Sequence, residues 1–430
     1  MKLLTLFNSN RKQLINFGIY FSANILKKLL PLLLLPVITY YLTPEEYGIW
    51  SIYQVMLVFS VPVIGMNMQN NITRNFFNKT RDELAQITSN VLIVLIANII
   101  LGLLLIFAYV LVFDQWNNFT AGWLYLVVIY AGANVLLGLD LTVLRNDKRA
   151  FAYSLFQLTH TLSIFGITIA LVVLYNYGWQ GQALGTVIAS IIFGIFGVFH
   201  LWRNGYVAFH LDKNVIREIL VISLPLVPHA VSSVIITMSD RLFIENMIGI
   251  DAVGIYSVGY QFGMVLLLVT DSFNLVWGPW IYEQLSSITE QRKQRIVLFT
   301  YGYNISVVLF AFLTTLASIF LIKFAIADTY SDATTYVLWV ALGYAIRAMY
   351  TMVFPYLVYV GKTSFLGIAS SIAAVINLIG NYVLISQNGA IGAAQATLLS
   401  YLILFLAIWW YAQRIHPMPW SLNWLRRKES

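Results

Sequence analysis

Twelve long stretches of apolar residues follow one another along the 430-residue chain, separated by short polar gaps. A hydrocarbon core about 30 Å thick needs about 20 apolar residues for one helical crossing, and each stretch is long enough for this. The pattern therefore predicts an all-α polytopic membrane protein with twelve transmembrane helices. The predicted spans are 14–42, 47–68, 87–113, 119–144, 151–175, 181–202, 219–247, 252–277, 296–323, 333–359, 364–386 and 390–412.

The basic residues indicate which gaps face the cytoplasm. Twenty of the 25 Lys and Arg residues lie at the termini or in every second gap. Short loops that carry Lys and Arg remain on the cytoplasmic side, so both termini are predicted to be cytoplasmic. The twenty residues are Lys2, Arg11, Lys12, Arg74, Lys79, Arg81, Arg145, Lys148, Arg149, Arg203, Lys213, Arg217, Arg292, Lys293, Arg295, Lys362, Arg414, Arg426, Arg427 and Lys428.

The composition of the chain is typical of a membrane protein, and its charge distribution indicates which class of partner it contacts. The chain is 60% hydrophobic and 10% charged, whereas soluble domains are about 45–50% apolar and about 25% charged. The net charge of +7 is spread over the membrane-facing rims, which favours contact with anionic lipid and not with nucleic acid. The chain contains no cysteine. The first apolar stretch is too long for the core of a signal peptide, and we expect it to be retained.

The second half of the chain repeats the first. Residues 42–51 match residues 248–257, each between the first two spans of its half. Shared turn chemistry in short outer loops would be the simpler explanation, but the matches occur in the same order at equivalent helix junctions. The further matched pairs are Lys148 with Lys362, Phe151 with Phe365, Gly178 with Gly389, Gly181 with Gly392, Ala183 with Ala394, and Thr186 with Thr397.

This repeat predicts two pseudo-symmetric lobes of six helices, residues 1–207 and 208–430. Six spans return the chain to its starting side, so the repeat is parallel and its axis runs along the membrane normal. A substrate site is then expected between the halves. The longest internal connection, residues 203–218, is too short for a domain outside the membrane.

Five basic residues depart from the loop pattern, namely Lys27, Lys28, Arg241, Lys323 and Arg347. Lys323 lies near the outer end of its span and can extend its amine to the interface. Arg241 follows Asp240, and we expect a local ion pair. Lys27, Lys28 and Arg347 lie within spans, where a charge costs about 2.5–3.5 kcal/mol.

These three mid-span cations predict a water-filled, positively charged cavity, because ionisable residues inside the membrane usually have a function. No acid lies within a helical turn of them. The alternative is that they pair across the bundle with Asp140, Asp271 or backbone carbonyls. The candidate substrate-binding residues are Lys27, Lys28, Arg347, Asn24, Tyr344, Tyr350 and Arg74.

A second polar stripe lies on the seventh span, where Pro225 and Pro228 precede His229 and Asp240. Proline bends helices, and histidine titrates near neutral pH, so this span is a candidate for gating or ion coupling. A buried histidine bonded to a carbonyl is an equal alternative for His229. The candidate coupling or gating residues are Asp240, His229, Asp271, Asn274 and His160.

Enzyme motifs are missing from the sequence. There is no G-x-S-x-G, no paired-histidine metal spacing, no P-loop and no dinucleotide fingerprint. We therefore expect a protein that is not an enzyme, that has no cofactor or metal, and that uses no ATP. Coupling to H⁺ or Na⁺ is left open.

Several segments resemble one known family. These are YLTPEEYG at 41–48, LRNDKRAFAY at 144–153, SLPLVPH at 223–229, DR at 240–241, and VGIYS at 253–257. They resemble segments of bacterial Wzx-type flippases for polysaccharide or O-antigen repeat units, a branch of the multidrug/oligosaccharidyl-lipid/polysaccharide exporter superfamily. The resemblance covers the whole chain in length, span count and motif order, and the twelve spans differ from the fourteen typical of peptidoglycan-precursor flippases.

The resemblance implies a V-shaped, MATE-like fold that opens a central cavity to each side of the inner membrane in turn. It implies an undecaprenyl-diphosphate-linked oligosaccharide as substrate, moved from the cytoplasmic to the outer leaflet, and partners among the polymerase and chain-length proteins of the same pathway. A cationic pocket suits a diphosphate. The alternatives are a drug or metabolite antiporter, which would favour an acidic cavity, and a membrane glycan polymerase or ligase, which would need a large outer loop.

Overall fold

The computed structural model describes residues 2–113, 115–116, 119–208, 211–286 and 288–421. The predicted basic residues Arg426, Arg427 and Lys428 lie outside these residues. Helices make up most of the described chain, which also contains a short antiparallel pair of strands, β1 (Gln115–Trp116) and β2 (Phe119–Thr120). Its contacts divide it into two units, Met1–Val234 and Ile235–Ser430, and each is described by itself.

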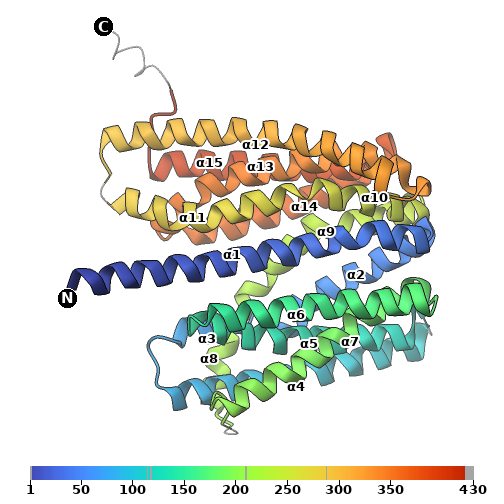
Figure 1. Cartoon of the computed structure of the whole chain (residues 1–430), viewed down its shortest axis with the longest axis horizontal. Coiled ribbons are helices and arrows are strands. Elements are labelled where there is room, and N and C mark those ends of the chain that lie inside the picture. The colour runs from blue at the N-terminus through green and yellow to red at the C-terminus, as the bar shows by residue number, and fades with distance from the viewer. Residues whose placement is uncertain (1, 114, 117–118, 209–210, 287, 422–430) are drawn as a thin grey trace. The chain divides into compact units, whose positions relative to one another are not determined.

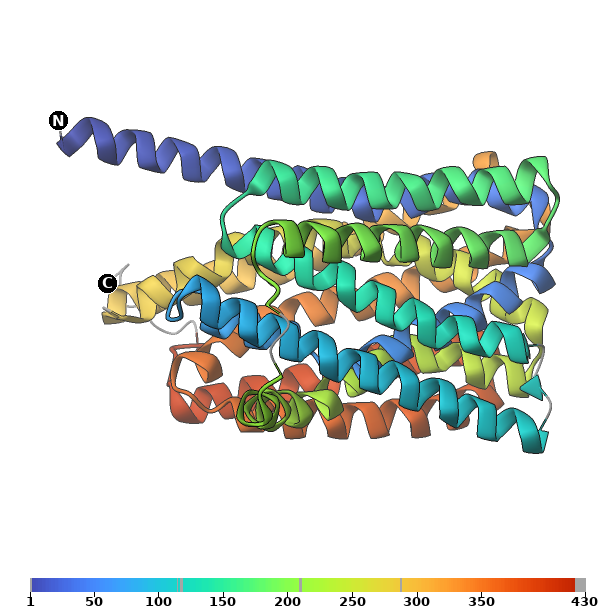
Figure 2. The ribbon, with the colours of Figure 1, turned by 90° about the horizontal axis from the view of Figure 1, so that it is seen from below.

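The first unit contains the elements up to the beginning of α9. They are α1 (Lys2–Tyr41), α2 (Pro44–Gly65), α3 (Gln69–Asn75), α4 (Arg81–Phe113), α5 (Ala121–Asn146), α6 (Ala150–Ile169), η1 (Ala170–Leu174), α7 (Gly178–Arg203), α8 (Lys213–Ser223), η2 (Leu224–Leu226) and α9 (Val227–Met247). Helix α7 packs along both α5 and α6, and Figure 2 shows α6 and α7 side by side in green. Helix α1 packs on α6.

The second unit contains the rest of α9 and all later elements. They are α10 (Ile250–Gly263), α11 (Leu266–Ser286), α12 (Glu290–Ala325), η3 (Asp328–Ala333), α13 (Thr334–Tyr359), α14 (Thr363–Asn388) and α15 (Ala390–Ile415). Helix α15 packs against α13 and α14, and the long helices of this unit run along one another (Figure 1).

The prediction of twelve spans is confirmed. Eleven helices of the described chain are long and apolar enough to cross a membrane, and a bent pair, Ile250–Gly263 with Leu266–Asn274, supplies the twelfth. This eighth span, predicted at 252–277, bends by 44° at Met264–Val265. The predicted connection at 203–218 is partly helical, because α8 begins at Lys213 and continues through η2 into α9.

Side-chain caps fix several of the helix ends. The Thr43 hydroxyl accepts from the Glu46 amide at 3.2 Å, and the Glu46 carboxylate accepts from the Thr43 amide at 3.1 Å. This reciprocal pair satisfies two amides that have no partner inside helix α2. Asp212 caps α8 in a similar way, since its Oδ1 accepts from the Asn214 amide at 2.8 Å. Polar residues in these gaps therefore determine where the spans begin.

Equivalent glycines bring the last two helices of each half together. A Cβ atom on Gly181 would lie 3.1 Å from the carbonyl carbon of Leu171, and one on Gly392 would lie 2.1 Å from the carbonyl oxygen of Leu384. Only glycine permits so close an approach of two backbones. The repeat predicted from these matched residues therefore has the same packing role in both units.

The second helix of each half ends at a glycine. In the first unit α2 ends at Gly65 and α3 begins after a turn, and in the second α10 ends at Gly263 before α11. A Cβ on Gly65 would lie 2.5 Å from Val135 of α5, and one on Gly263 would lie 2.6 Å from Val340 of α13. The absence of a side chain therefore lets a neighbouring helix pack closely at both of these helix ends.

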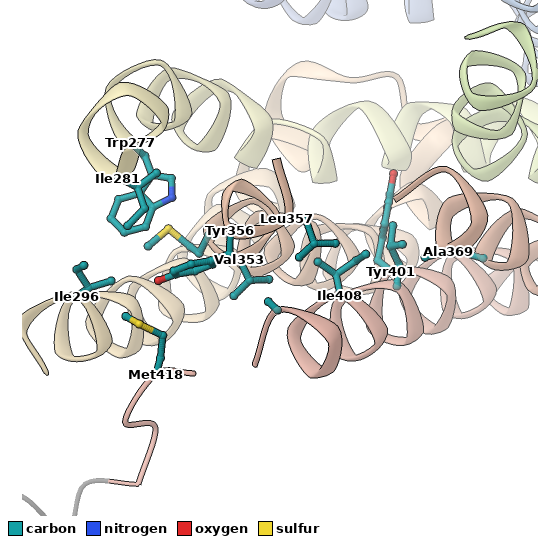
Figure 3. Close-up of a cluster of buried hydrophobic side chains, with 14 of the residues drawn as sticks. Trp277, Ile281, Ile296, Val353, Tyr356, Leu357, Ala369, Tyr401, Ile408 and Met418 are labelled. Atoms are coloured by element: carbon teal, nitrogen blue, oxygen red, sulfur yellow. The ribbon is translucent and has the colours of Figure 1, made fainter. Parts of the chain in front are cut away.

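Each unit has its own apolar core. In the second unit α11, α12, α13, α14 and α15 contribute buried side chains to one cluster (Figure 3). Trp277, Ile281 and Leu357 are among them, each at most 3% exposed. In the first unit the core lies between α4 and α5 and includes Val91 and Leu139. These cores hold the polar residues of the spans in place.

Candidate functional site

A fully buried ion pair lies on α9. Nη1 of Arg241 is 2.8 Å from Oδ1 of Asp240, and the two side chains are 4% and 0% exposed. Nη1 also donates to the carbonyl oxygen of Thr237 at 3.1 Å. The Tyr256 hydroxyl donates to the other carboxylate oxygen of Asp240 at 2.5 Å. The local ion pair predicted from the sequence is therefore confirmed, and both charges are compensated where they are buried.

A row of tyrosines leads from this pair to the predicted residue Tyr344. The Arg241 guanidinium lies 4.5 Å from the ring centre of Tyr260. The hydroxyls of Tyr260 and Tyr344 are 2.7 Å apart, and the Tyr344 ring lies 6.1 Å from that of Tyr401 on α15. Aromatic rings and a guanidinium attract one another in such an arrangement. Tyr344 is thus buried and serves to support α13.

Arg347, one turn after Tyr344 on α13, forms a second ion pair. Its Nη1 lies 3.2 Å from Oδ1 of Asp271 on α11. The two side chains are 32% and 35% exposed, in contrast to the buried pair on α9. Pairing with Asp271 was one of the alternatives that the sequence left open. The structure therefore joins a predicted binding residue to a predicted coupling residue.

Other candidate residues lie close to this second pair. Asn274 lies on α11 one turn after Asp271, and its Oδ1 is buried without a hydrogen-bond partner among the described residues. Tyr350 is half-buried, and its ring stacks on that of Phe354, 5.7 Å away on the same helix. The surroundings of Arg347 therefore combine a carboxylate, an amide and aromatic faces.

The remaining predicted cations lie in the first unit. Lys27 and Lys28 are exposed on α1, and Asn24 is half-buried one turn earlier. Lys27 interacts electrostatically with His160 of α6, in keeping with the packing of α1 on α6. Arg74 is exposed in the last turn of α3. These residues are held in a different unit from Arg347.

The two histidine candidates differ in their surroundings. His160 is 7% exposed, with Nε2 3.4 Å from the Ser190 hydroxyl of α7 and its ring 5.3 Å from that of Phe193. It packs as a core residue. His229 is exposed in the first turn of α9, which begins directly after η2.

Two polar contacts were not predicted from the sequence. Asp140, named as a possible partner of the mid-span cations, pairs instead with His200, since its Oδ1 lies 2.6 Å from Nδ1 of that histidine. Asn377 and Asn381 lie one turn apart on α14, and Oδ1 of Asn377 accepts from the Ser239 hydroxyl at 3.1 Å. Two fully buried amides at a spacing of four residues in an apolar span were the available signal.

Ligand sets for a metal are not found in the described part of the chain, where no group of three or more His, Asp or Glu side chains is placed to hold an ion. The chemistry available near Arg347 is that of charge pairing and hydrogen bonding. A guanidinium that is one-third exposed can bind an oxyanion through two parallel N–H donors.

Known proteins resemble this chain in sequence and in fold. A family model described as polysaccharide biosynthesis protein matches residues 14–285. A protein of Haemophilus influenzae, Lsg locus putative protein 1, is 24% identical over 294 residues, which are 66% of this chain and 70% of that protein.

Solved structures of transporters share the fold. The lipid II flippase MurJ in an inward closed conformation aligns with a TM-score of 0.67 at 15% identity, over 94% of this chain and 87% of that one. An inward-facing MATE family multidrug resistance transporter of the MOP superfamily aligns with a TM-score of 0.65 at 13% identity, over 94% and 96% of the two chains. At these identities the likeness establishes the fold alone, and the predicted MATE-like class of fold is confirmed.

Proposed function

Because the chain belongs to the polysaccharide biosynthesis protein family, we propose that it is a flippase for undecaprenyl-diphosphate-linked oligosaccharide repeat units. It moves them from the cytoplasmic to the outer leaflet of the bacterial inner membrane, with both of its own termini in the cytoplasm. The protein is a multi-pass membrane protein of a transporter fold and not an enzyme.

The observation that carries this proposal is the contrast between the two arginines of the second unit. Arg241 is enclosed by Asp240 and Tyr256, and its charge stabilises the fold. Arg347 lies 3.2 Å from Asp271, and a third of its side chain is exposed. Placing an arginine inside a membrane span costs free energy. Binding of an anionic cargo would give this arginine a function.

A diphosphate is well suited to such a residue. The guanidinium presents five N–H donors in a rigid fork that matches the spacing of phosphate oxygens. The contact with Asp271 engages Nη1, so a diphosphate would compete with the carboxylate for this group. In the proposed cycle the cargo displaces Asp271 from Arg347, and Lys27 and Lys28 supply further positive charge in the first unit.

The carboxylate of Asp271, once displaced from Arg347, offers a means of coupling cargo movement to an ion gradient. Asp240 is held by Arg241 and the Tyr256 hydroxyl, whereas Asp271 is 35% exposed and can accept H⁺ or Na⁺ when Arg347 binds cargo. We therefore propose Asp271 as the coupling carboxylate, with Asn274 beside it. Energy would come from an ion gradient or the membrane potential, since the chain has no P-loop for ATP.

A drug or metabolite antiporter is the second candidate, because the fold is shared with a MATE family transporter. Its cargo would be cationic and would favour acidic side chains, whereas Lys27, Lys28 and Arg347 are basic. A glycan polymerase or ligase is disfavoured because the family and the similar structures point to a transporter.

Replacement of the basic residues tests the proposed cargo. In a strain that depends on this protein, Lys28→Ala and Arg347→Ala should each lower surface glycan about tenfold, because a hydrogen bond to a charged group contributes about 1.5–3 kcal/mol. Lys323→Ala, which removes an exposed charge near the end of α12, is the control and should leave glycan unchanged. Normal glycan in both test variants, at equal protein levels in the membrane, would refute the cationic site.

A further inference from the structure

Two apolar grooves flank α7 in the first unit, along the half of the helix that ends at Arg203. One groove of about 810 Å³ runs between α4 and α7 above Leu136 of α5. The other, of about 490 Å³, runs between α6 and α7 above Leu144 of α5. Phe199 of α7 lines both. The two grooves are therefore neighbours, separated by the α7 side chains.

The side chains along these grooves are exposed and apolar. In the first groove Ile96 is 56% exposed and Ile195 is 63% exposed. In the second, Leu155 and Phe196 are 52% and 57% exposed. Within a membrane span such surfaces contact hydrocarbon, and a groove accepts a chain that a flat helix face would not hold. A lipid with two acyl chains can place one chain on each side of Phe199.

Charge at the end of α7 favours an anionic headgroup there. Arg203 is exposed and lines the second groove, and Arg149, the residue before α6, is close enough to interact electrostatically with Asp140. The two acids nearby are already paired, Asp140 with His200 at 2.6 Å and Asp147 with Arg149 at 3.8 Å. Arg203 therefore supplies the positive charge that faces the membrane surface.

The position relative to the membrane agrees with this charge. Arg203 belongs to a gap that the basic pattern places on the cytoplasmic side, and anionic lipids give the cytoplasmic leaflet a negative surface. Trp202, which lines the first groove and is 55% exposed, is a residue type that favours the headgroup level. We propose that one anionic diacyl phospholipid binds across α7, with a chain in each groove and its phosphate at Arg203.

Competitive lipid retention tests the headgroup. The full-length protein in a neutral detergent is mixed with equal amounts of phosphatidylglycerol and phosphatidylcholine of the same acyl chains, and the retained lipids are counted by native mass spectrometry. The wild type should prefer phosphatidylglycerol. Arg203→Gln should lower that preference about fivefold, since a basic residue near an anionic lipid surface contributes about 1 kcal/mol. Lys362→Gln, which removes an exposed charge on the same predicted side, should not.

A second pair of variants tests the chains independently of charge. Ile96→Trp fills the first groove, and Leu104→Trp adds the same bulk to an exposed position of α4 outside it. Ile96→Trp alone should reduce retention of diacyl phosphatidylglycerol, and neither variant should reduce retention of the single-chain lyso form. Equal retention of both headgroups by the wild type, an Arg203→Gln effect no larger than that of Lys362→Gln, or displacement of the diacyl lipid by undecaprenyl phosphate would each overturn the proposal.

Discussion

The two arginines of the second unit differ in burial, since the side chain of Arg241 is 4% exposed and that of Arg347 is 32% exposed. The ion pair of Asp240 and Arg241 was predictable because the residues are adjacent. The pairing of Arg347 with Asp271 was only one of several alternatives, because the partners lie 76 residues apart on different helices. The amides of Asn377 and Asn381 were overlooked because neutral residues in an apolar span give a weaker signal than charges do.

The buried pair on α9 predicts a large effect on stability. Arg241→Ala leaves the carboxylate of Asp240 buried with the Tyr256 hydroxyl but without its cation, and breaking a buried pair in this way costs about 3–5 kcal/mol. The free energy of unfolding, measured by denaturant titration in detergent micelles, should fall by that amount.

Arg347→Ala is the matched comparison, because it removes an arginine from a pair that is one-third exposed. Exposed pairs contribute at most about 1 kcal/mol, so its effect on unfolding should be small. An Arg241→Ala variant as stable as Arg347→Ala would contradict the structural role of the Asp240–Arg241 pair. It would also contradict the assignment of Arg241 to stability and Arg347 to binding.

At the level of helices, the length of the apolar stretches predicted the spans but not the bend in the eighth one. The length of an apolar stretch and the charges that flank it are visible within one segment of the sequence. The bend at Met264–Val265 follows Gly263, which lies close to Val340 of α13, and a contact between two helices is not visible in one segment. Helix α8 was also not predicted, because its short amphipathic pattern was included in the connection at 203–218.

The segment after α15 folds back through polar contacts. Oε1 of Gln413 accepts from the Met418 amide at 2.9 Å and from Nε1 of Trp420 at 2.8 Å. The Tyr301 hydroxyl donates to the carbonyl oxygen of Trp420 at 2.9 Å. His416 lies within this segment, with its ring 5.7 Å from that of Tyr356.

This segment should loosen in acid. Burial, followed by the nearby charge of Lys293, lowers the pKa of His416 below its usual value. The folded segment thus favours neutral histidine, and the stabilisation present above about pH 6.5 is lost as pH falls towards the lower folded pKa. Hydrogen exchange at residues 413–420, corrected for intrinsic rates, should be faster at about pH 5.5 than at about pH 7.5. His416→Gln should remove this difference, and an unchanged pH dependence in that variant would assign it to another group.

For the whole molecule, hydropathy, charge alternation and the internal repeat predicted the all-α membrane fold that the likeness to MurJ and to a MATE family transporter confirms. The substrate is harder to derive, because one fold serves different cargoes and a few side chains decide among them. Lys27, Lys28 and Arg347 are candidate binding residues because they are charged residues within apolar spans. This reason does not depend on which glycan is carried.

We propose that this chain alone moves a lipid-linked anionic glycan without ATP. It is tested most directly in liposomes that contain only the purified protein and an undecaprenyl-diphosphate-linked oligosaccharide in one leaflet. The oligosaccharide that reaches the other leaflet is detected with a membrane-impermeant lectin. We predict translocation that is driven by an ion gradient or membrane potential, needs no ATP, and is slowed about tenfold by Arg347→Ala. No transfer above that in protein-free liposomes, or transfer only when ATP is added, would contradict this account.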